Sequence, residues 1–240
     1  MSEIEIKRAV ILAGGKGTRL RPYTVVVPKP LMPIGEFPIL EIIIRQLNFY
    51  GFKHITLAVN HQADLIKAFF QNGSKWGVKI DYSLEDQPLG TMGPLKVINN
   101  LPENFLIMNG DILSDINYQE LYEHHCKSKS TFTISSCVRN NKIDYGVLHS
   151  DQNNCLIKLE EKPSLTYQVS MGIYVASSSI LDFIPAETHF GFDDLMSVML
   201  KRNFPVNLHN FNGYWLDIGR PDDYAIAIEE FEKVKSKFLL

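Results

Sequence analysis

Short apolar runs alternate with amphipathic stretches along the first 140 residues of this chain. Residues 9–13, 54–59 and 105–108 are almost wholly apolar, as expected for strands buried on both faces of a sheet. Apolar positions recur at helical spacing over residues 40–47, and Gly51 marks the end of that helix. This alternation predicts parallel strands joined by helical crossovers, with helices covering both faces of the sheet.

The pattern changes after about residue 140, where the predicted strands become shorter. They cover residues 145–150, 155–162, 169–177, 206–211 and 214–219, with helices near 178–184 and 193–202. Pro221, followed by two aspartates, is typical of the first turn of a helix. We therefore expect one α/β domain over residues 1–240. Its first half ends near residue 140, a second part covers about 141–220, and a C-terminal helix covers 221–240.

Composition restricts the class of partner. The chain has 240 residues, of which 45% are hydrophobic, and a formal net charge of -3. It has no run of lysine and arginine, so neither a nucleic-acid partner nor an anionic membrane surface is expected. Its first residues are charged, and no apolar run is long enough to span a bilayer. The three cysteines form no CxxC pair, which favours reduced thiols in a cytoplasmic protein.

The strongest chemical signal directly follows the first predicted strand. Gly14, Gly15 and Gly17 allow backbone amides to approach a polyphosphate, and neighbouring cations add positive charge. The spacing is neither that of a Walker loop nor that of a dinucleotide fold. Lys29 lies between two prolines that stiffen the chain on both sides, which is consistent with a second phosphate contact.

Asp111 ends another apolar run and follows Asn109 and Gly110, which leave the strand end open to a ligand. This placement favours a functional role over the alternative, a cap of the helix that begins soon afterwards. His124, His125 and Cys126 are adjacent in a helical stretch without spaced partners, so we interpret them as part of a surface or half-buried helix face and not as a zinc site.

Together these segments resemble the sugar nucleotidylyltransferases, or nucleoside-diphosphate-sugar pyrophosphorylases. The resemblance is carried by LAGGKGTRLRPYT, PKPLMPIG, EDQPLGTMGPL, MNGD, DYGVL, EEKP, GIYV and WLDIGRPDDY, and extends from about residue 8 to 230. It implies a Rossmann-like (GT-A-like) mostly parallel mixed sheet flanked by helices, with an inserted sugar-binding subdomain. The left-handed β-helix domain that many relatives append is not expected here.

The resemblance also implies a role for individual residues. Catalytic roles fall on Arg19, Lys29 and Lys162, and Asp111 and Asp217 would hold Mg²⁺, the expected cofactor. The nucleotide would be bound by Leu12, Ala13, Gly14, Gly15, Gly17, Thr18, Glu85, Gly90 and Thr91, and the sugar by Asn109, Tyr145, Gly146, Glu161, Lys162 and Ser170.

Glu85 stands where uridylyl- and thymidylyltransferases usually carry glutamine. A carboxylate only accepts hydrogen bonds, which suits the two adjacent donors of guanine. This favours GTP. Asp86 and Gln87 are alternative residues for hydrogen bonding to the base. The sequence is most similar to mannose-1-phosphate and heptose-1-phosphate guanylyltransferases. The expected substrate is a mannose-, heptose- or amino-sugar-type 1-phosphate. Those enzymes usually have an asparagine before the small residue and glycine of this strand, whereas this chain has Ser170 and Met171, so the sequence does not select one of these sugars.

The predicted reaction joins a nucleoside triphosphate to a sugar 1-phosphate and releases pyrophosphate. The alternatives are a cytidylyl-, uridylyl- or thymidylyltransferase on the same fold, or a nucleotide-sugar-binding module without catalysis. A glycosyltransferase is disfavoured because Leu113 breaks a D-x-D motif. The expected partners are the two small-molecule substrates and, as a possibility, further copies of the chain associating through the catalytic domain.

Overall fold

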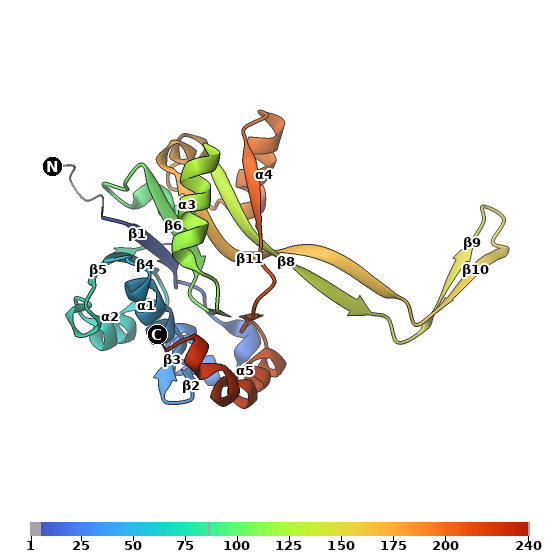
Figure 1. Ribbon diagram of the computed structural model, residues 1–240, viewed down its shortest axis with the longest axis horizontal. Helices are drawn as coiled ribbons and strands as arrows, with labels where there is room; N and C mark the ends of the chain where they lie inside the picture. The colour runs from blue at the N-terminus through green and yellow to red at the C-terminus, as the bar shows by residue number, and fades with distance from the viewer. Residues whose placement is uncertain (1–5, 86, 240) are drawn as a thin grey trace.

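A seven-stranded mixed sheet forms the centre of the molecule (Figure 1). The structure is a computed structural model that describes residues 6–85 and 87–239. Strands β1, β4, β5 and β6 are mutually parallel, β12 is parallel to β8, and β11 is antiparallel to both of its neighbours. The order is β12 (Val206–Asn210), β8 (Phe132–Lys142), β11 (Ser164–Ser177), β6 (Asn104–Asn109), β1 (Arg8–Leu12), β4 (His54–Val59) and β5 (Lys79–Leu84). The predicted mostly parallel mixed sheet is confirmed.

Two hydrophobic cores lie on opposite faces of this sheet. Because successive strand residues point to opposite faces, Ala9 and Ile11 of β1 belong to one core and Val10 belongs to the other. The first core is covered by α1 (Ile39–Phe49), α2 (Ala63–Phe70), α3 (Tyr118–Ser128) and α5 (Pro221–Val234). The second is covered by α4 (Phe192–Lys201) and two 3-10 turns, η5 (Gly93–Val97) and η6 (Ser178–Phe183).

The remaining elements are short. Small strand pairs join β2 (Pro33–Ile34) to β3 (Phe37–Pro38) and β7 (Ile112–Ser114) to β13 (Trp215–Asp217). Further 3-10 turns are η1 (Thr18–Leu20), η2 (Tyr23–Val25), η3 (Lys29–Leu31), η4 (Ser74–Trp76) and η7 (Lys235–Lys237). The helix predicted near 178–184 is such a turn, whereas the helix beginning at Pro221 is confirmed. Within the described part of the chain, no helix is both long enough and apolar enough to cross a membrane.

Strands β8 and β11 continue far beyond the sheet as a two-stranded ribbon (Figure 1). At its far end, β9 (Gly146–Ser150) and β10 (Leu156–Glu161) form an antiparallel hairpin. We call residues 138–168 the arm. The sequence pattern predicts short strands here, but it does not predict that they leave the body of the molecule.

Candidate active site

A cavity of about 410 Å³ opens at the carboxyl ends of the parallel strands. Ligands bind at this edge in open α/β sheets, and the volume is of the size that small molecules occupy. It is lined by Leu12, Ala13, Gly14, Gly15, Gly17, Thr18, Arg19, Lys29, Pro30, Asn60, Glu85, Pro88, Gly90, Thr91, Pro94, Asn109, Gly110, Asp111, His189 and Gly219. Every residue predicted to bind the nucleotide lies in this lining.

The glycine loop is held in place by the turn that follows it. Gly17 has φ +59°, and a Cβ added to it would lie 2.8 Å from Thr24 Cγ2. The Thr24 hydroxyl donates to the Gly17 carbonyl oxygen at 2.7 Å. Only glycine combines this backbone conformation with so close an approach. By contrast, a Cβ on Gly15 would meet nothing within 4 Å, so space remains beside that residue.

Glu85 is fixed at one side of the cavity. Its backbone N–H donates to Val59, and Asn60 Nδ2 donates to its carbonyl oxygen at 2.9 Å. The carboxylate Oε2 accepts from the Leu89 N–H at 3.0 Å. Burial raises the pKa of Glu85, and the Leu89 hydrogen bond opposes that rise. The result is an oriented, half-buried acceptor beside Gly14, whose Cβ position lies 3.1 Å from Glu85 Oε1.

The loop after Glu85 rests on the segment that precedes α4. Gly90 has φ +81°, and a Cβ there would lie 2.7 Å from the Phe190 carbonyl oxygen. That oxygen accepts the N–H groups of Met92 and Gly93, and Thr91 Oγ1 accepts the Phe192 N–H. This packing brings His189 to the cavity. Sequence reasoning missed His189, and nothing in its local sequence marks it.

Two carboxylates approach each other across the β7–β13 pair. Asp111 follows β6, Asp217 ends β13, and the Ile218 N–H donates to the Asp111 carbonyl oxygen at 3.0 Å. Burial and then the charge of Asp111 raise the pKa of Asp217, whereas Lys29 and Arg19 act in the opposite direction. Lys29 Nζ forms an ion pair with Asp111 Oδ2. Asp217 itself lies beside the lining residue Gly219, whose Cβ position is 3.4 Å from Asp217 Oδ1.

This carboxylate pair fits a divalent cation that is also held by substrate. The Asp111 Oδ1 atom is buried and has no hydrogen-bond partner, so it is available to a metal ion. Mg²⁺ is commonly held by one or two carboxylates together with phosphate oxygens and water. Over residues 6–85 and 87–239, no cluster of three or more His, Cys, Asp or Glu side chains could hold a metal by itself. The helix-cap alternative for Asp111 fails because Asn117 caps α3, accepting the N–H groups of Gln119 and Glu120.

The residues predicted to bind the sugar separate into two groups. Asn109 lines the cavity and contacts Gly172 of β11, whose Cβ position lies 2.7 Å from Asn109 Nδ2. Ser170, on the same strand, lies outside the lining, and its hydroxyl donates to Tyr174 at 3.2 Å. Met171 is fully buried in the core and is therefore not a sugar contact.

The other four predicted sugar-binding residues, Tyr145, Gly146, Glu161 and Lys162, lie on the arm. Gly146 pairs with Glu161 across β9 and β10, and Tyr145 is 79% exposed. The structure brings these four residues together but leaves them outside the cavity lining.

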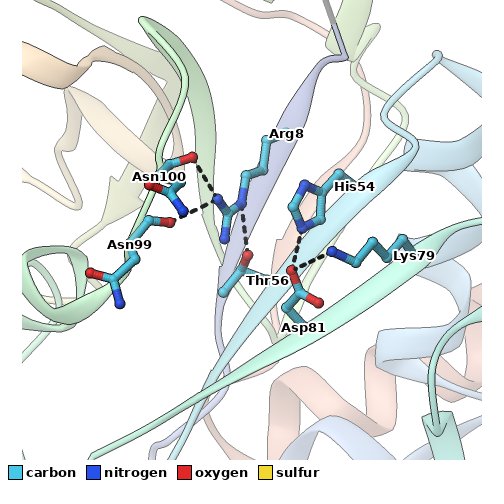
Figure 2. Close-up of polar contacts among 7 residues, drawn as sticks. All are labelled: Arg8, His54, Thr56, Lys79, Asp81, Asn99 and Asn100. Atoms are coloured by element: carbon cyan, nitrogen blue, oxygen red, sulfur yellow. Dashed lines mark hydrogen bonds and ion pairs between the residues drawn. The ribbon is translucent and has the colours of Figure 1, made fainter.

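A second cavity, of about 500 Å³, lies beside the amino ends of β1 and β4 and along β5. There the buried Arg8 donates to Thr56 Oγ1 and to the carbonyl oxygens of Asn99 and Asn100, at 2.9 to 3.1 Å (Figure 2). His54 and Lys79 both contact Asp81, at 2.5 and 3.2 Å. The charged side chains here bind other groups of the protein, and that of Arg8 holds the 99–100 loop against the sheet. We therefore place the functional site at the opposite edge.

Comparison with known proteins identifies the family. Residues 8–234 match the family described as Nucleotidyl transferase. The chain belongs to this family. It is 32% identical to a UTP--glucose-1-phosphate uridylyltransferase of Synechocystis sp. and 34% identical to a mannose-1-phosphate guanyltransferase of Yarrowia lipolytica, over 92% and 90% of this chain. It spans 62% of the length of each of these relatives.

The solved structures agree on the fold. HddC from Yersinia pseudotuberculosis, complexed with GMP-PN, superposes with a TM-score of 0.73 at 29% identity, covering 94% of this chain and 99% of HddC. The nucleotidyl transferase resemblance seen in the sequence is thereby confirmed. Since the relatives include both uridylyl- and guanylyltransferases, family membership alone leaves the base undecided.

Proposed function

We propose that this chain transfers a nucleoside monophosphate from a nucleoside triphosphate, preferentially GTP, to a sugar 1-phosphate and releases pyrophosphate. The observation that carries this proposal is the convergence of three features on one cavity. The glycine loop, the cations Arg19 and Lys29, and Asp111 all lie at the carboxyl edge of the sheet. These features suit a triphosphate better than a neutral ligand.

In the proposed reaction, an oxygen of the sugar phosphate attacks the α-phosphorus of the nucleotide. The bond from that phosphorus to the bridging oxygen breaks, and pyrophosphate leaves. The attacking phosphate is already ionised, so no general base is required. Arg19 and Lys29 would neutralise the developing charge, and Lys162 would hold the sugar phosphate. When bound by Asp111 and Asp217, Mg²⁺ would supply further positive charge at the phosphates.

Guanine is the proposed base because Glu85 presents a fixed acceptor in the cavity, which matches the adjacent N1–H and N2–H donors of guanine. A relative named mannose-1-phosphate guanyltransferase and the HddC complex with GMP-PN support this choice. Of the alternative readers, Asp86 lies outside the described residues. Gln87 is exposed and donates to the Glu187 carbonyl oxygen at 3.2 Å.

The test is a pyrophosphate-release assay with Mg²⁺ across GTP, CTP, UTP, dTTP and ATP, each with hexose, amino-sugar and heptose 1-phosphates. We expect release with GTP and one class of sugar phosphate. Release with another nucleotide would retain the reaction and reject the role given to Glu85. No release from folded protein in any combination would favour a nucleotide-sugar-binding module without catalysis.

A single substitution tests the carboxylate pair. Asp111→Asn should lower kcat by at least about 100-fold, because it removes charge where the cation and the phosphates meet. The control is Asp64→Asn, which neutralises an exposed carboxylate in the first turn of α2. We expect Asp64→Asn to keep full activity and the wild-type unfolding temperature, and Asp111→Asn to stay folded at the assay temperature although Lys29 loses its ion-pair partner. Full activity of folded Asp111→Asn would reject the metal assignment.

A further inference from the structure

The base of the arm is tied to the body, since Arg139 donates to the Trp215 carbonyl oxygen and Gln168 donates to Asn210 Oδ1. Beyond this base the arm extends away from the body (Figure 1). The β8–β11 pairing is continuous from Ser136 opposite Ser170 to Lys142 opposite Ser164. Six residues of β8 beyond Ser136 span about 20 Å at 3.3 Å per residue. The β9–β10 hairpin continues outward from that point.

Large apolar side chains are exposed along the whole arm. They are Val138, Tyr145, Leu148, Leu156, Ile157, Leu159, Leu165 and Tyr167. The facing pair Leu148 and Leu159 is 67% and 59% exposed. A two-stranded ribbon is marginally stable by itself in water, and an extended exposed apolar surface marks a contact site. The arm therefore needs a surface to pack against.

A second exposed apolar surface lies beside the cavity. Tyr23, Val25, Val26 and Val27 follow the glycine loop and are 37% to 71% exposed. This segment is fixed to the nucleotide site, because Thr24 between them bonds to Gly17. We call residues 23–27 the apolar rim.

We propose that the arm of one copy of this chain docks across the apolar rim and cavity of a second copy. Tyr145, Gly146, Glu161 and Lys162 of each copy then complete the sugar side of the other copy's site. The role given to these side chains rests on the proposed function. A second copy is the fitting occupant, because the arm and the rim occur on the same chain. A two-fold pairing therefore covers both arms and both rims at once.

The alternative is that the arm bends back onto its own cavity. In the structure β8 and β11 lead the arm away from the body, the β9–β10 hairpin turns at the end of this ribbon (Figure 1), and the ladder at the base is intact between Ser136–Lys142 and Ser164–Ser170. Bending back would break part of that ladder, and each lost hydrogen bond disfavours the bent form.

The first measurement is the mass in solution by light scattering. We expect a dimer or a larger assembly for the wild-type protein. The Leu148→Ser, Leu159→Ser double variant should be monomeric while keeping the far-ultraviolet circular dichroism of the wild type. The control is Leu200→Ser, which changes a residue of α4 that is 66% exposed and lies away from both the arm and the rim. A monomeric wild-type protein, or a double variant that stays dimeric, would overturn the proposal.

The second measurement separates exchanged arms from arms that serve their own cavity. Lys162→Ala and Asp111→Asn each damage a different half of the site, and each should be nearly inactive alone. Co-expressed with two different tags and purified through both, the mixed dimer should recover about half of wild-type activity, since one of its two sites is then intact. A mixed dimer no more active than the separate variants would overturn the exchange, as would full activity of Lys162→Ala alone.

The matched control pairs wild-type chain with the Asp111→Asn, Lys162→Ala double variant. With exchanged arms this mixed dimer should be inactive, because each site receives one damaged half. If each arm serves its own cavity, about half of wild-type activity should remain. Failure of the proposed function gives a different result. The wild-type protein would then be inactive with every substrate pair, while the light-scattering comparison would still decide whether the arm holds two copies together.

Discussion

At the residue scale, Lys29 is held by a partner in the cavity. Its ammonium group pairs with Asp111, and only 11% of its side chain is exposed. We expect the same group to turn to the phosphates of the substrate when a cation takes its place beside the two carboxylates. Such an exchange would keep the local charge balanced while the cavity fills, since buried unpaired charges are costly.

Glu85 allows the choice of base to be tested directly. Glu85→Gln should lower kcat/KM for GTP by about 10- to 100-fold, because an amide cannot accept from both guanine donors. The ratio of UTP to GTP use should rise. Initial rates with both nucleotides measure this shift. Gln87→Ala is the control and should leave the ratio unchanged. If Glu85→Gln and the wild-type protein use the two nucleotides in the same ratio, another group reads the base.

At the element scale, β11 links the body, the cavity and the arm. Its pairing with β8 shifts register between Ser170 and Tyr174, where Gly172 adopts φ +72° beside Asn109. Such a bulge redirects a strand and often lies next to a functional site. Here it separates the fully buried part of β11 from the exposed part that forms the arm.

Gly172→Ala should lower the free energy of unfolding by about 2 kcal/mol, since it adds left-handed backbone strain and a steric clash. The displaced Asn109 should also raise KM for the sugar phosphate. Gly51→Ala is a matched control, because Gly51 has φ +85° but a Cβ there meets nothing within 4 Å. Gly51→Ala should lower the free energy of unfolding through backbone strain alone, and it should not lower activity. Equal effects of the two variants on both measurements would contradict this account. Chemical denaturation and initial rates supply the comparison.

Helix α3 is attached to the sheet by a buried histidine. His125 Nδ1 contacts Thr133 Oγ1 at 2.8 Å, and its Nε2 contacts Asn104 Oδ1 at 3.2 Å. Burial lowers the pKa of His125 to about 4, with a smaller effect from His124. The unfolded chain therefore binds more protons than the folded chain between pH 6.5 and about 4. Stability is lost as pH falls through that window.

When the pH falls from 7.5 to 5.5, protonation of His125 in the unfolded chain should lower the free energy of unfolding by about 1 kcal/mol. His125→Gln should lose this part of the pH dependence, although its stability at pH 7.5 is lower than that of the wild type. His124→Gln changes the exposed neighbour and should retain the dependence. Urea denaturation at the two pH values measures the difference. An unchanged pH dependence in His125→Gln would show that other groups cause the loss.

At the scale of the whole molecule, the carboxyl and amino edges of the parallel strands differ in function. The carboxyl edge holds the candidate active site, and at the amino edge the Arg8 network lines the second cavity and joins the strands to the 99–100 loop (Figure 2). Arg8 is 6% exposed and joins β1 to β4 and to the 99–100 loop. This arrangement stabilises the sheet at the edge away from the candidate active site.

Arg8→Met should therefore lower the free energy of unfolding by about 2 kcal/mol, because it leaves the buried Thr56 hydroxyl and two part-buried carbonyl oxygens without their donor. Activity of the folded protein should stay within about twofold of wild type, since Arg8 lies at the edge opposite the cavity. Lys79→Met is the control, because it removes an exposed ion pair that contributes little. Thermal unfolding measures the predicted loss of stability, and pyrophosphate release measures the predicted activity. A large loss of activity in folded Arg8→Met would show that the edges are coupled.

The sequence by itself determined the elements that depend on local chemistry. Alternating apolar runs predicted the strands and both helical layers, and Pro221 with its acidic neighbours predicted the start of α5. The glycine loop and Asp111 could be placed at strand ends, because parallel strands bring their carboxyl ends to one edge. For that reason the predicted nucleotide-binding residues could be expected at a common edge before the cavity was seen.

Contacts between distant segments were decided by the tertiary structure alone. His189 reaches the cavity because the 88–93 loop packs on Phe190, and no local pattern encodes that contact. Arg8 finds its acceptors at Asn99 and Asn100, more than ninety residues away. The arm is the clearest case. Its alternating strands look like those of an ordinary sheet, because strand periodicity records which side chains share a face and not what covers that face.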